Sequence, residues 1–320
     1  MRLLFTLPEF WPYVQRGSER VARELGVELS RRGHRVTILT RTPGARPERR
    51  RDEGVRVVHR PRRHYRRPHL RGPSEALTDL ESFAVTALLG DLVRRVDAVH
   101  AFYLTDAFGV TLAERLRRRP VVLSLHGPPG RAWWEAEHPR THRWFLRALP
   151  RIAAVTVLSE DSAARMRRDY GVDPVVLMPG IRCDELELPV RPRARRAVVC
   201  AAAVDDRRKR VDLLVAAWAA VAAEQDDVDL RFVGGGAPHL VDAARERLPE
   251  RLRARVTHRA VPSRALAEEY AAATVGALTS EAEAFGLVLL ESQAAGLPVV
   301  GTRQGGIPEV VGPGCGALFD

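Results

Sequence analysis

Short apolar runs rich in β-branched residues alternate with helical patterns along most of the 320 residues. Residues 1–7 form a run typical of a buried strand, residues 18–32 have the spacing of an amphipathic helix, and residues 35–40 form the next strand. Further strands are expected at residues 55–59, 97–102, 121–125, 155–158 and 175–178. Strands separated by helix-length segments pair in parallel through crossovers, which predicts an α/β protein with doubly wound parallel sheets.

A second series of the same kind follows. Its strands are expected at residues 197–203, 229–233, 255–259, 275–278 and 298–301, and its helices at 212–224, 239–246, 263–273 and 287–295. Two prolines and mixed charges without periodicity separate the two series, which predicts domains at 1–183 and 196–320 joined by a linker at 184–195. Doubly wound domains bind ligands at the carboxyl ends of their strands, so we expect a ligand cleft between the two sheets.

The chain is strongly basic, with 51 lysines and arginines against 40 acidic residues and a formal net charge of +11. Lys209 is the single lysine, and this imbalance indicates a GC-rich, bacterial genome. Most of the excess charge is expected on solvated surface. The alternative is attraction to nucleic acid, acidic lipid or phosphorylated substrates.

Residues 60–71 concentrate six arginines and two histidines without an acidic residue. This run is either a solvated loop or a docking surface for an anionic acceptor or an anionic membrane. In the second case the contacts come from Arg62, Arg63, Arg66 and Arg67. No helix-turn-helix, zinc-finger or RNA-binding signature accompanies the run, so we expect no nucleic-acid partner.

Three features bear on localisation. No apolar run reaches the roughly 18 residues that a membrane-spanning helix needs, and the first apolar stretch is too short for a signal peptide. The chain has three cysteines, an odd number, and they lie far apart in the sequence at positions 183, 200 and 315. This argues against a disulfide framework. We expect a cytoplasmic protein, and the arginine run extends that expectation to peripheral contact at the inner membrane face.

The most informative segment surrounds the helix expected at 287–295. Gly286 permits a tight entry into this helix, whose side chains are almost all apolar and must therefore be buried. Glu291 lies inside it, and a buried carboxylate needs either an arginine partner or the hydroxyl donors of a ligand. Glu283 precedes the helix, near free N–H groups that suit a phosphate. Two carboxylates beside a phosphate-binding site suit a sugar nucleotide, because one can bind ribose hydroxyls and the other hexose hydroxyls.

This segment resembles the signature of family 4 glycosyltransferases. The run Glu-Ala-Phe-Gly at 283–286 precedes Glu-Ser-Gln-Ala-Ala-Gly-Leu-Pro-Val-Val at 291–300, and a Gly-Gly-x-Pro-Glu turn similar to the family's next block follows at 305–309. The resemblance implies a retaining enzyme of the GT-B fold, with two Rossmann-like domains and a nucleoside-diphosphate sugar as donor. It also implies that the chain is truncated at its C-terminus, which leaves the second domain incomplete.

The resemblance places a phosphate-binding lysine in the second domain. Lys209 matches the family's lysine, which neutralises the donor pyrophosphate, whereas the family's arginine falls on Val204 and is replaced by Arg207 or Arg208. Lys209 and Arg208 are therefore expected to stabilise the departing diphosphate. A Gly-Gly-Gly turn at 234–236 is expected to let the backbone approach the donor nucleotide closely.

The same resemblance assigns the two carboxylates. Glu291 is expected to hold the ribose of the donor and Glu283 the hexose. Further donor contacts are expected at Phe285, Gly286 and Leu287.

Two landmarks of the family lie in the first domain. Gly17 opens a helix in a pattern similar to the family's Gly-Gly-x-Glu, with Arg16 in place of the first glycine, and it is expected to contact the donor. His126, directly after the strand at 121–125, resembles the family's sugar-contacting histidine, the alternative being a histidine that only caps the strand. His126, Glu283 and Lys209 form the predicted catalytic group, whereas His100 is assigned to structure.

Asp227-Val228-Asp229 resembles the Asp-x-Asp metal motif of the other glycosyltransferase fold. Because it falls between a helix and a strand, we interpret it as a loop, and we expect neither a metal nor another cofactor. Ser159 and Cys200 have no neighbouring base in the sequence, so a nucleophilic triad finds no support.

The predicted reaction is transfer of a hexose from a nucleoside-diphosphate sugar to an acceptor hydroxyl on a lipid, a glycan or a small metabolite, with retained anomeric configuration. One alternative is another GT-B enzyme, a phosphorylase or a sugar-nucleotide epimerase. The other is a basic protein that binds anionic polymers through its arginine excess.

Overall fold

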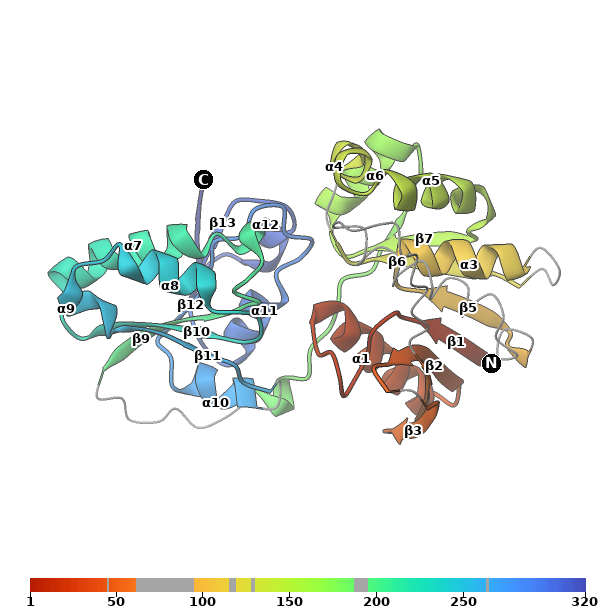
Figure 1. The fold of residues 1–320 in the computed structure, drawn as a ribbon, viewed down its shortest axis with the longest axis horizontal. Helices are drawn as coiled ribbons and strands as arrows, with labels where there is room; N and C mark the ends of the chain where they lie inside the picture. The colour runs from red at the N-terminus through yellow and green to blue at the C-terminus, as the bar shows by residue number, and fades with distance from the viewer. Residues whose placement is uncertain (45, 62–94, 115–118, 128–129, 187–194, 263–264) are drawn as a thin grey trace, which may run out of the picture. The chain divides into compact units, whose positions relative to one another are not determined.

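The computed structural model describes residues 1–44, 46–61, 95–114, 119–127, 130–186, 195–262 and 265–320. It contains two compact units. The first unit comprises Met1–Leu158 and Ser162–Met178, and the second comprises Ser159–Asp161 and Pro179–Asp320 (Figure 1). The predicted docking residues Arg62, Arg63, Arg66 and Arg67 lie outside the described residues, as does most of the predicted linker at 184–195.

The first unit is built on an eight-stranded sheet of order β3-β4-β2-β1-β5-β6-β7-β8. Its strands are β1 (Arg2–Thr6), β2 (Arg35–Thr42), β3 (Glu48–Asp52), β4 (Val55–Pro61), β5 (Ala98–Ala101), β6 (Val121–Leu125), β7 (Ala154–Val157) and β8 (Val175–Val176). All neighbouring strands pair in parallel except β3 and β4, which are antiparallel.

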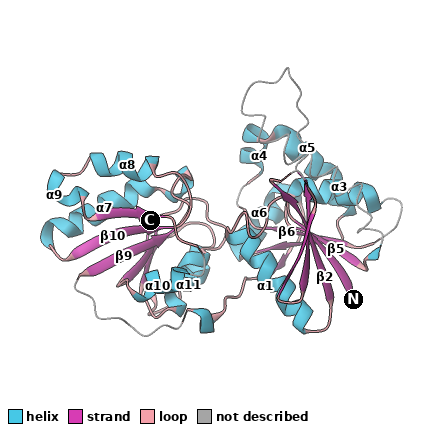
Figure 2. Cartoon of the chain, turned by 60° about the horizontal axis from the view of Figure 1, so that its bottom comes forward, coloured by secondary structure: helices cyan, strands magenta, loops and turns pink. Residues whose placement is uncertain are grey.

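Helices cover both faces of this sheet (Figures 1 and 2). They are α1 (Gly17–Arg31), α3 (Leu104–Glu114), α4 (Arg131–Glu137), α5 (Pro139–Ala148) and α6 (Glu160–Tyr170). Successive strand residues point to opposite faces, so Phe5 packs in one core with Ala22 and Val27 of α1, whereas Leu4 packs in another with Val110 of α3.

The second unit is built on a six-stranded, wholly parallel sheet of order β11-β10-β9-β12-β13-β14. Its strands are β9 (Arg196–Ala201), β10 (Val228–Val233), β11 (Val256–Arg259), β12 (Val275–Leu278), β13 (Val299–Thr302) and β14 (Gly316–Phe319). The helices are α7 (Val211–Glu224), α8 (His239–Glu246), α9 (Glu250–Arg253), α10 (Leu266–Ala271), α11 (Leu287–Ala294) and α12 (Ile307–Val310). In both ribbon views α7 and α8 lie on one face and α10 and α11 on the other.

The expected strands and helices are all present, with bounds that differ by a few residues. The structure adds elements that the sequence analysis did not name, among them β14, which pairs in parallel with β13, and β3, which pairs antiparallel with β4. The sequence of β3, Glu-Arg-Arg-Arg-Asp, has no apolar residue because β3 is an edge strand, and charge on an edge prevents pairing with another chain. The turn into β4 uses Glu53 and Gly54, both with positive φ, as a two-residue hairpin requires.

None of the helices in the described part of the chain is long and apolar enough to cross a membrane.

Candidate active site

Three loops meet at the carboxyl ends of neighbouring strands in the second unit. They follow β9, β12 and β13, which are adjacent in the sheet. The first holds Lys209, the second Glu283 and the third Gly305 and Gly306. The sheet order thus brings together segments that lie far apart in the sequence.

The loop after β9 is a short 3-10 turn, Arg207–Lys209, capped by Asp206. The Asp206 carboxylate accepts from the Arg208 backbone N–H at 3.0 Å and from the Arg208 guanidinium at 2.6 Å. The Arg208 carbonyl accepts from the Glu281 backbone N–H at 2.7 Å, and the Thr279 hydroxyl donates to the Lys209 carbonyl at 2.9 Å. These bonds fix the turn against the loop after β12.

Lys209 and Glu283 form an ion pair between these two loops. The Lys209 Nζ lies 2.5 Å from the Glu283 Oε2, and each side chain is only 19% exposed. The Cys200 thiol is buried nearby, and burial, together with the charge of Glu283, raises its pKa to about 12. Cys200 is therefore a neutral thiol at pH 7. The structure brings the predicted lysine and glutamate into direct contact.

Backbone packing sets the position of Glu283. Gly306 donates its N–H to the Glu283 carbonyl at 2.9 Å. A Cβ atom on Gly305 would lie 2.0 Å from the same carbonyl oxygen, and Gly305 has a φ of +57°. Only glycine fits there. Gly286, with a φ of +100°, then turns the chain into α11.

Glu291 lies on α11 and is 3% exposed. Its Oε2 accepts a hydrogen bond from the Tyr270 hydroxyl of α10 at 2.8 Å. The sequence analysis expected an arginine or a ligand hydroxyl as a partner, and the phenol of Tyr270 is a partner that it did not name. Of the other predicted donor residues, Phe285 is buried and Leu287, the first residue of α11, is half-buried. The first N–H groups of such a helix have no partner within it.

In the first unit, the corresponding strand ends carry histidines and hydroxyls. The His100 Nε2 lies 2.6 Å from the Ser124 hydroxyl, which lies 2.6 Å from the Thr156 hydroxyl. Phe102 stacks on His100 and meets the His126 ring edge to face. Burial lowers the pKa of His100 to about 4. Burial and the neighbouring His100 lower the pKa of His126 to about 3, so both rings are neutral at pH 7.

The family model described as Glycosyltransferase Family 4 matches residues 15–185, and the model of the Glycosyl transferases group 1 matches residues 195–320. The chain belongs to glycosyltransferase family 4. No curated protein sequence matches it.

Solved structures similar to this glycosyltransferase share its whole fold. Sucrose-phosphate synthase from Thermosynechococcus elongatus is 22% identical, with a TM-score of 0.80 over 99% of this chain and 85% of that one. HepE of Anabaena, in complex with UDP and glucose, is 19% identical, with a TM-score of 0.76 over 100% of this chain and 85% of that one. WaaG, a glycosyltransferase involved in lipopolysaccharide biosynthesis, is 19% identical, with a TM-score of 0.70 over 99% of this chain and 85% of that one. The fold is GT-B, with two Rossmann-like domains.

In this glycosyltransferase, Val204 occupies the position of the family's arginine, and it has a structural role. Val204 is fully buried, and its N–H bonds to the Gly235 carbonyl of the glycine turn after β10. Arg208 is held by Asp206 on the turn itself. Arg207 is exposed and lines a pocket of about 300 Å³ beside α7 and α8, together with Arg210 and Arg247. Arg208 therefore remains the predicted helper of Lys209.

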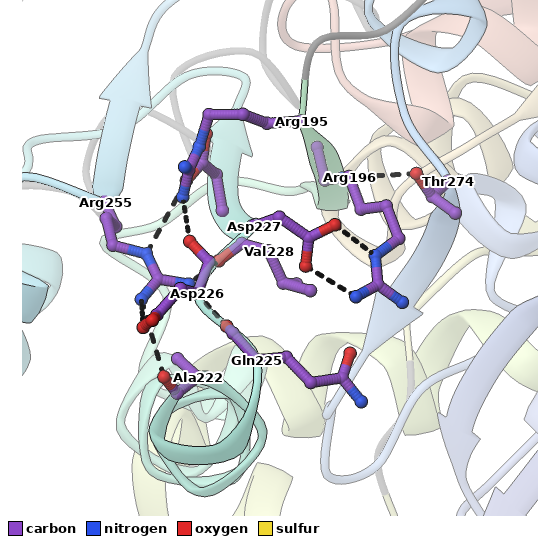
Figure 3. A network of polar contacts seen from close by, with 11 residues as sticks. Arg195, Arg196, Ala222, Gln225, Asp226, Asp227, Val228, Arg255 and Thr274 are labelled. Atoms are coloured by element: carbon purple, nitrogen blue, oxygen red, sulfur yellow. Dashed lines mark hydrogen bonds and ion pairs between the residues drawn. The ribbon is translucent and has the colours of Figure 1, made fainter.

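The Asp-x-Asp sequence lies at the opposite, amino edge of the second sheet (Figure 3). Asp227 pairs with Arg196 at 2.5 Å, and Asp229 pairs with Arg195 at 2.9 Å. Arg196 lowers the pKa of Asp227. Arg255 donates to the Val228 carbonyl at 2.6 Å. The interpretation as a loop is wrong for two of the three residues, because Val228 and Asp229 are the first residues of β10. The two acids join the beginnings of β9, β10 and β11.

Gly17 is the first residue of α1, and Arg16 before it is the cap residue. The Arg16 backbone N–H donates to the Glu19 Oε2 at 3.2 Å, and the Tyr103 hydroxyl lies 3.4 Å from the Glu19 Oε1. Glu19 is fully buried, and this burial raises its pKa. The glutamate of the Gly-x-Glu pattern therefore caps the helix from inside.

Sequence reasoning missed two polar groups, Tyr270 on α10 and the Ser124–Thr156 hydroxyl pair on β6 and β7. Neither lies in a motif, and each partner is supplied by a different strand or helix. A buried tyrosine one helix before a buried glutamate was the signal available for Tyr270, because a buried phenol needs an acceptor.

Proposed function

We propose that this family 4 glycosyltransferase transfers a hexose from a nucleoside-diphosphate sugar to an acceptor hydroxyl with retention of anomeric configuration. The observation that carries the proposal is the Lys209–Glu283 pair, a largely buried cation and anion at the carboxyl ends of β9 and β12. Ligands of doubly wound sheets bind at such ends. Support for a nucleotide-sugar donor comes from HepE, which was solved with UDP and glucose.

Lys209 is proposed to exchange Glu283 for the donor diphosphate. Its ammonium is a compact charge, and it is most effective when negative charge grows on the leaving group. The N-terminus of α11 adds a positive dipole end close to Glu283. Once released from Lys209, the Glu283 carboxylate accepts hydrogen bonds from hydroxyls of the hexose. Glu291, on α11, accepts hydrogen bonds from hydroxyls of the ribose.

His126 is proposed to contact the hexose as a neutral ring. With a pKa near 3 it holds one N–H donor and one acceptor at pH 7, and both suit sugar hydroxyls. In the transfer, the bond between the anomeric carbon and the phosphate oxygen breaks and a bond to the acceptor oxygen forms on the same face. The acceptor proton passes to the departing diphosphate. Cationic side chains neutralise that group, so the proposal needs no metal.

The test is incubation of the protein with UDP-, GDP- and ADP-glucose and a panel of hydroxyl acceptors, with and without EDTA. We expect released nucleoside diphosphate together with a glycoside whose anomeric configuration, measured by NMR, is that of the donor sugar. The rate of transfer should be the same with and without EDTA. Released sugar phosphate would indicate a phosphorylase, and an isomerised sugar nucleotide an epimerase. Salt-dependent binding of anionic polymers without any effect of nucleotide sugars would indicate the binding protein instead.

A further inference from the structure

Tyr270 is the largest of the fully buried side chains among the described residues, with 0% exposure. It reaches from α10 into the core that Val199 of β9 and Val233 of β10 form on that face of the sheet. Val288 of α11 packs against the same core. A phenol this deep costs free energy unless its hydroxyl finds an acceptor. The acceptor is the Oε2 of Glu291, at 2.8 Å.

This hydrogen bond is one of the contacts that orient the Glu291 carboxylate. A carboxylate is planar, so anchoring one oxygen limits rotation of the group and sets the direction of the other oxygen. The phenol O–H donates and a carboxylate oxygen of Glu291 accepts. Hydrogen bonds to a charged acceptor in a buried site are stronger than neutral ones.

We infer that Tyr270 is a positioning residue for nucleotide recognition, acting through Glu291 to orient the carboxylate that receives the ribose hydroxyls. The inference rests on the proposed function, in which Glu291 holds the ribose. Tyr270 lies 21 residues before Glu291 and outside the motif that contains it. Tyr270 is not itself a ligand contact, because it is fully buried.

The test compares Tyr270→Phe with the wild type in calorimetric binding of UDP and 2′,3′-dideoxy-UDP, and of the matching ADP and GDP pairs. The variant keeps the ring and loses only the hydroxyl. We expect affinity for the ribonucleotide to fall about tenfold, as for loss of one hydrogen bond to a charged group. Affinity for the dideoxynucleotide should stay within about twofold, because it lacks the hydroxyls that Glu291 receives.

The matched control is Tyr13→Phe. It removes a tyrosine–glutamate hydrogen bond of the same length, 2.8 Å to Glu48, from the first unit. This control should bind both nucleotides as the wild type does. An equal loss of both nucleotides in Tyr270→Phe, or no loss of either, overturns the positioning role.

The outcomes for the two proposals are separable. If the wild type binds ribo- and dideoxynucleotides equally, the assignment of the ribose to Glu291 fails. If Glu291→Ala abolishes the ribose preference while Tyr270→Phe preserves it, only the role of Tyr270 fails. Should Tyr270→Phe not fold, replacement of tyrosine by 3-fluorotyrosine strengthens the phenol as a donor and must change the ratio of the two affinities. An unchanged ratio overturns the inference.

Discussion

The two sheets differ sharply at their carboxyl ends. In the second unit, the loops after β9 and β12 carry charged pairs, among them Lys209–Glu283 and Arg210–Glu281. In the first unit, β5 and β6 end in His100 and His126, whose rings burial keeps neutral. The same architecture therefore carries charged pairs after two strands of one unit and neutral histidines at two strands of the other. The charged pairs suit a diphosphate and the histidines a neutral sugar or acceptor.

The largest effect is expected from Lys209→Ala, which removes the ammonium that pairs with Glu283. We expect kcat to fall about a hundredfold or more and substrate binding to weaken far less, because charge on the diphosphate peaks in the transition state. Steady-state kinetics with the best donor of the panel measure both. Lys209→Arg should restore part of the activity, since a planar guanidinium does not reproduce a compact ammonium. Full activity of the arginine variant would contradict this role for the single lysine.

Glu283→Ala tests the other half of the pair. We expect turnover to fall about tenfold or more, because the hexose loses an acceptor. Affinity for the nucleoside diphosphate should be kept or increased, since Lys209 no longer has to leave its carboxylate partner. Calorimetry with the nucleoside diphosphate alone distinguishes the two effects. Weaker diphosphate binding in this variant would mean that Glu283 is not exchanged for the donor.

The neutral histidines of the first unit predict a pH dependence of stability. The pKa of His100 is about 4 when folded and near 6.5 when unfolded, so the unfolded chain takes up the extra proton first. Stability from this group is complete above about pH 6.5 and declines as the pH falls towards 4, by about 2 kcal/mol between pH 7.5 and 5. Chemical denaturation at several pH values should show a shallower decline for His100→Gln.

Other titratable groups with shifted pKa values remain in both proteins of that comparison, among them His126 and Asp106. His126 acts in the same direction as His100. Asp106, whose pKa burial raises to about 8, acts in the opposite direction, because its stabilising contribution is lost as the pH rises towards 8. Equal slopes for the wild type and His100→Gln would show that His100 is not held neutral by the fold.

The smallest effect is expected at the amino edge of the second sheet. Arg196→Ala breaks a solvent-exposed ion pair with Asp227, and such pairs contribute little. Activity, nucleotide affinity and melting temperature should all match the wild type. A loss of activity in Arg196→Ala would show that the Asp-x-Asp sequence takes part in function.

Regular elements followed from the sequence where apolar periodicity was strong, as in β6 and α8, whose predicted bounds match the observed ones. β3 was missed because an edge strand buries no apolar side chain and its residues are all charged. Lys209 and Glu283 were found through motifs. Their direct pairing was not, because it depends on β9 lying beside β12, a long-range property of the sheet order. Tyr270 was missed for the same reason.

The Lys209–Glu283 pair has a consequence for the order of events during synthesis. Its partners are 74 positions apart, and β10 and β11 are made between β9 and β12 although neither lies between them in the sheet. Closing so long a loop costs conformational entropy, and the contact offsets this cost only after it has formed. On the ribosome, α7 can fold soon after it emerges, whereas the donor site cannot exist until β12 and its loop have followed. The pairing of Lys209 with Glu283 thus has to wait until residue 283 has been made, although Lys209 is made much earlier.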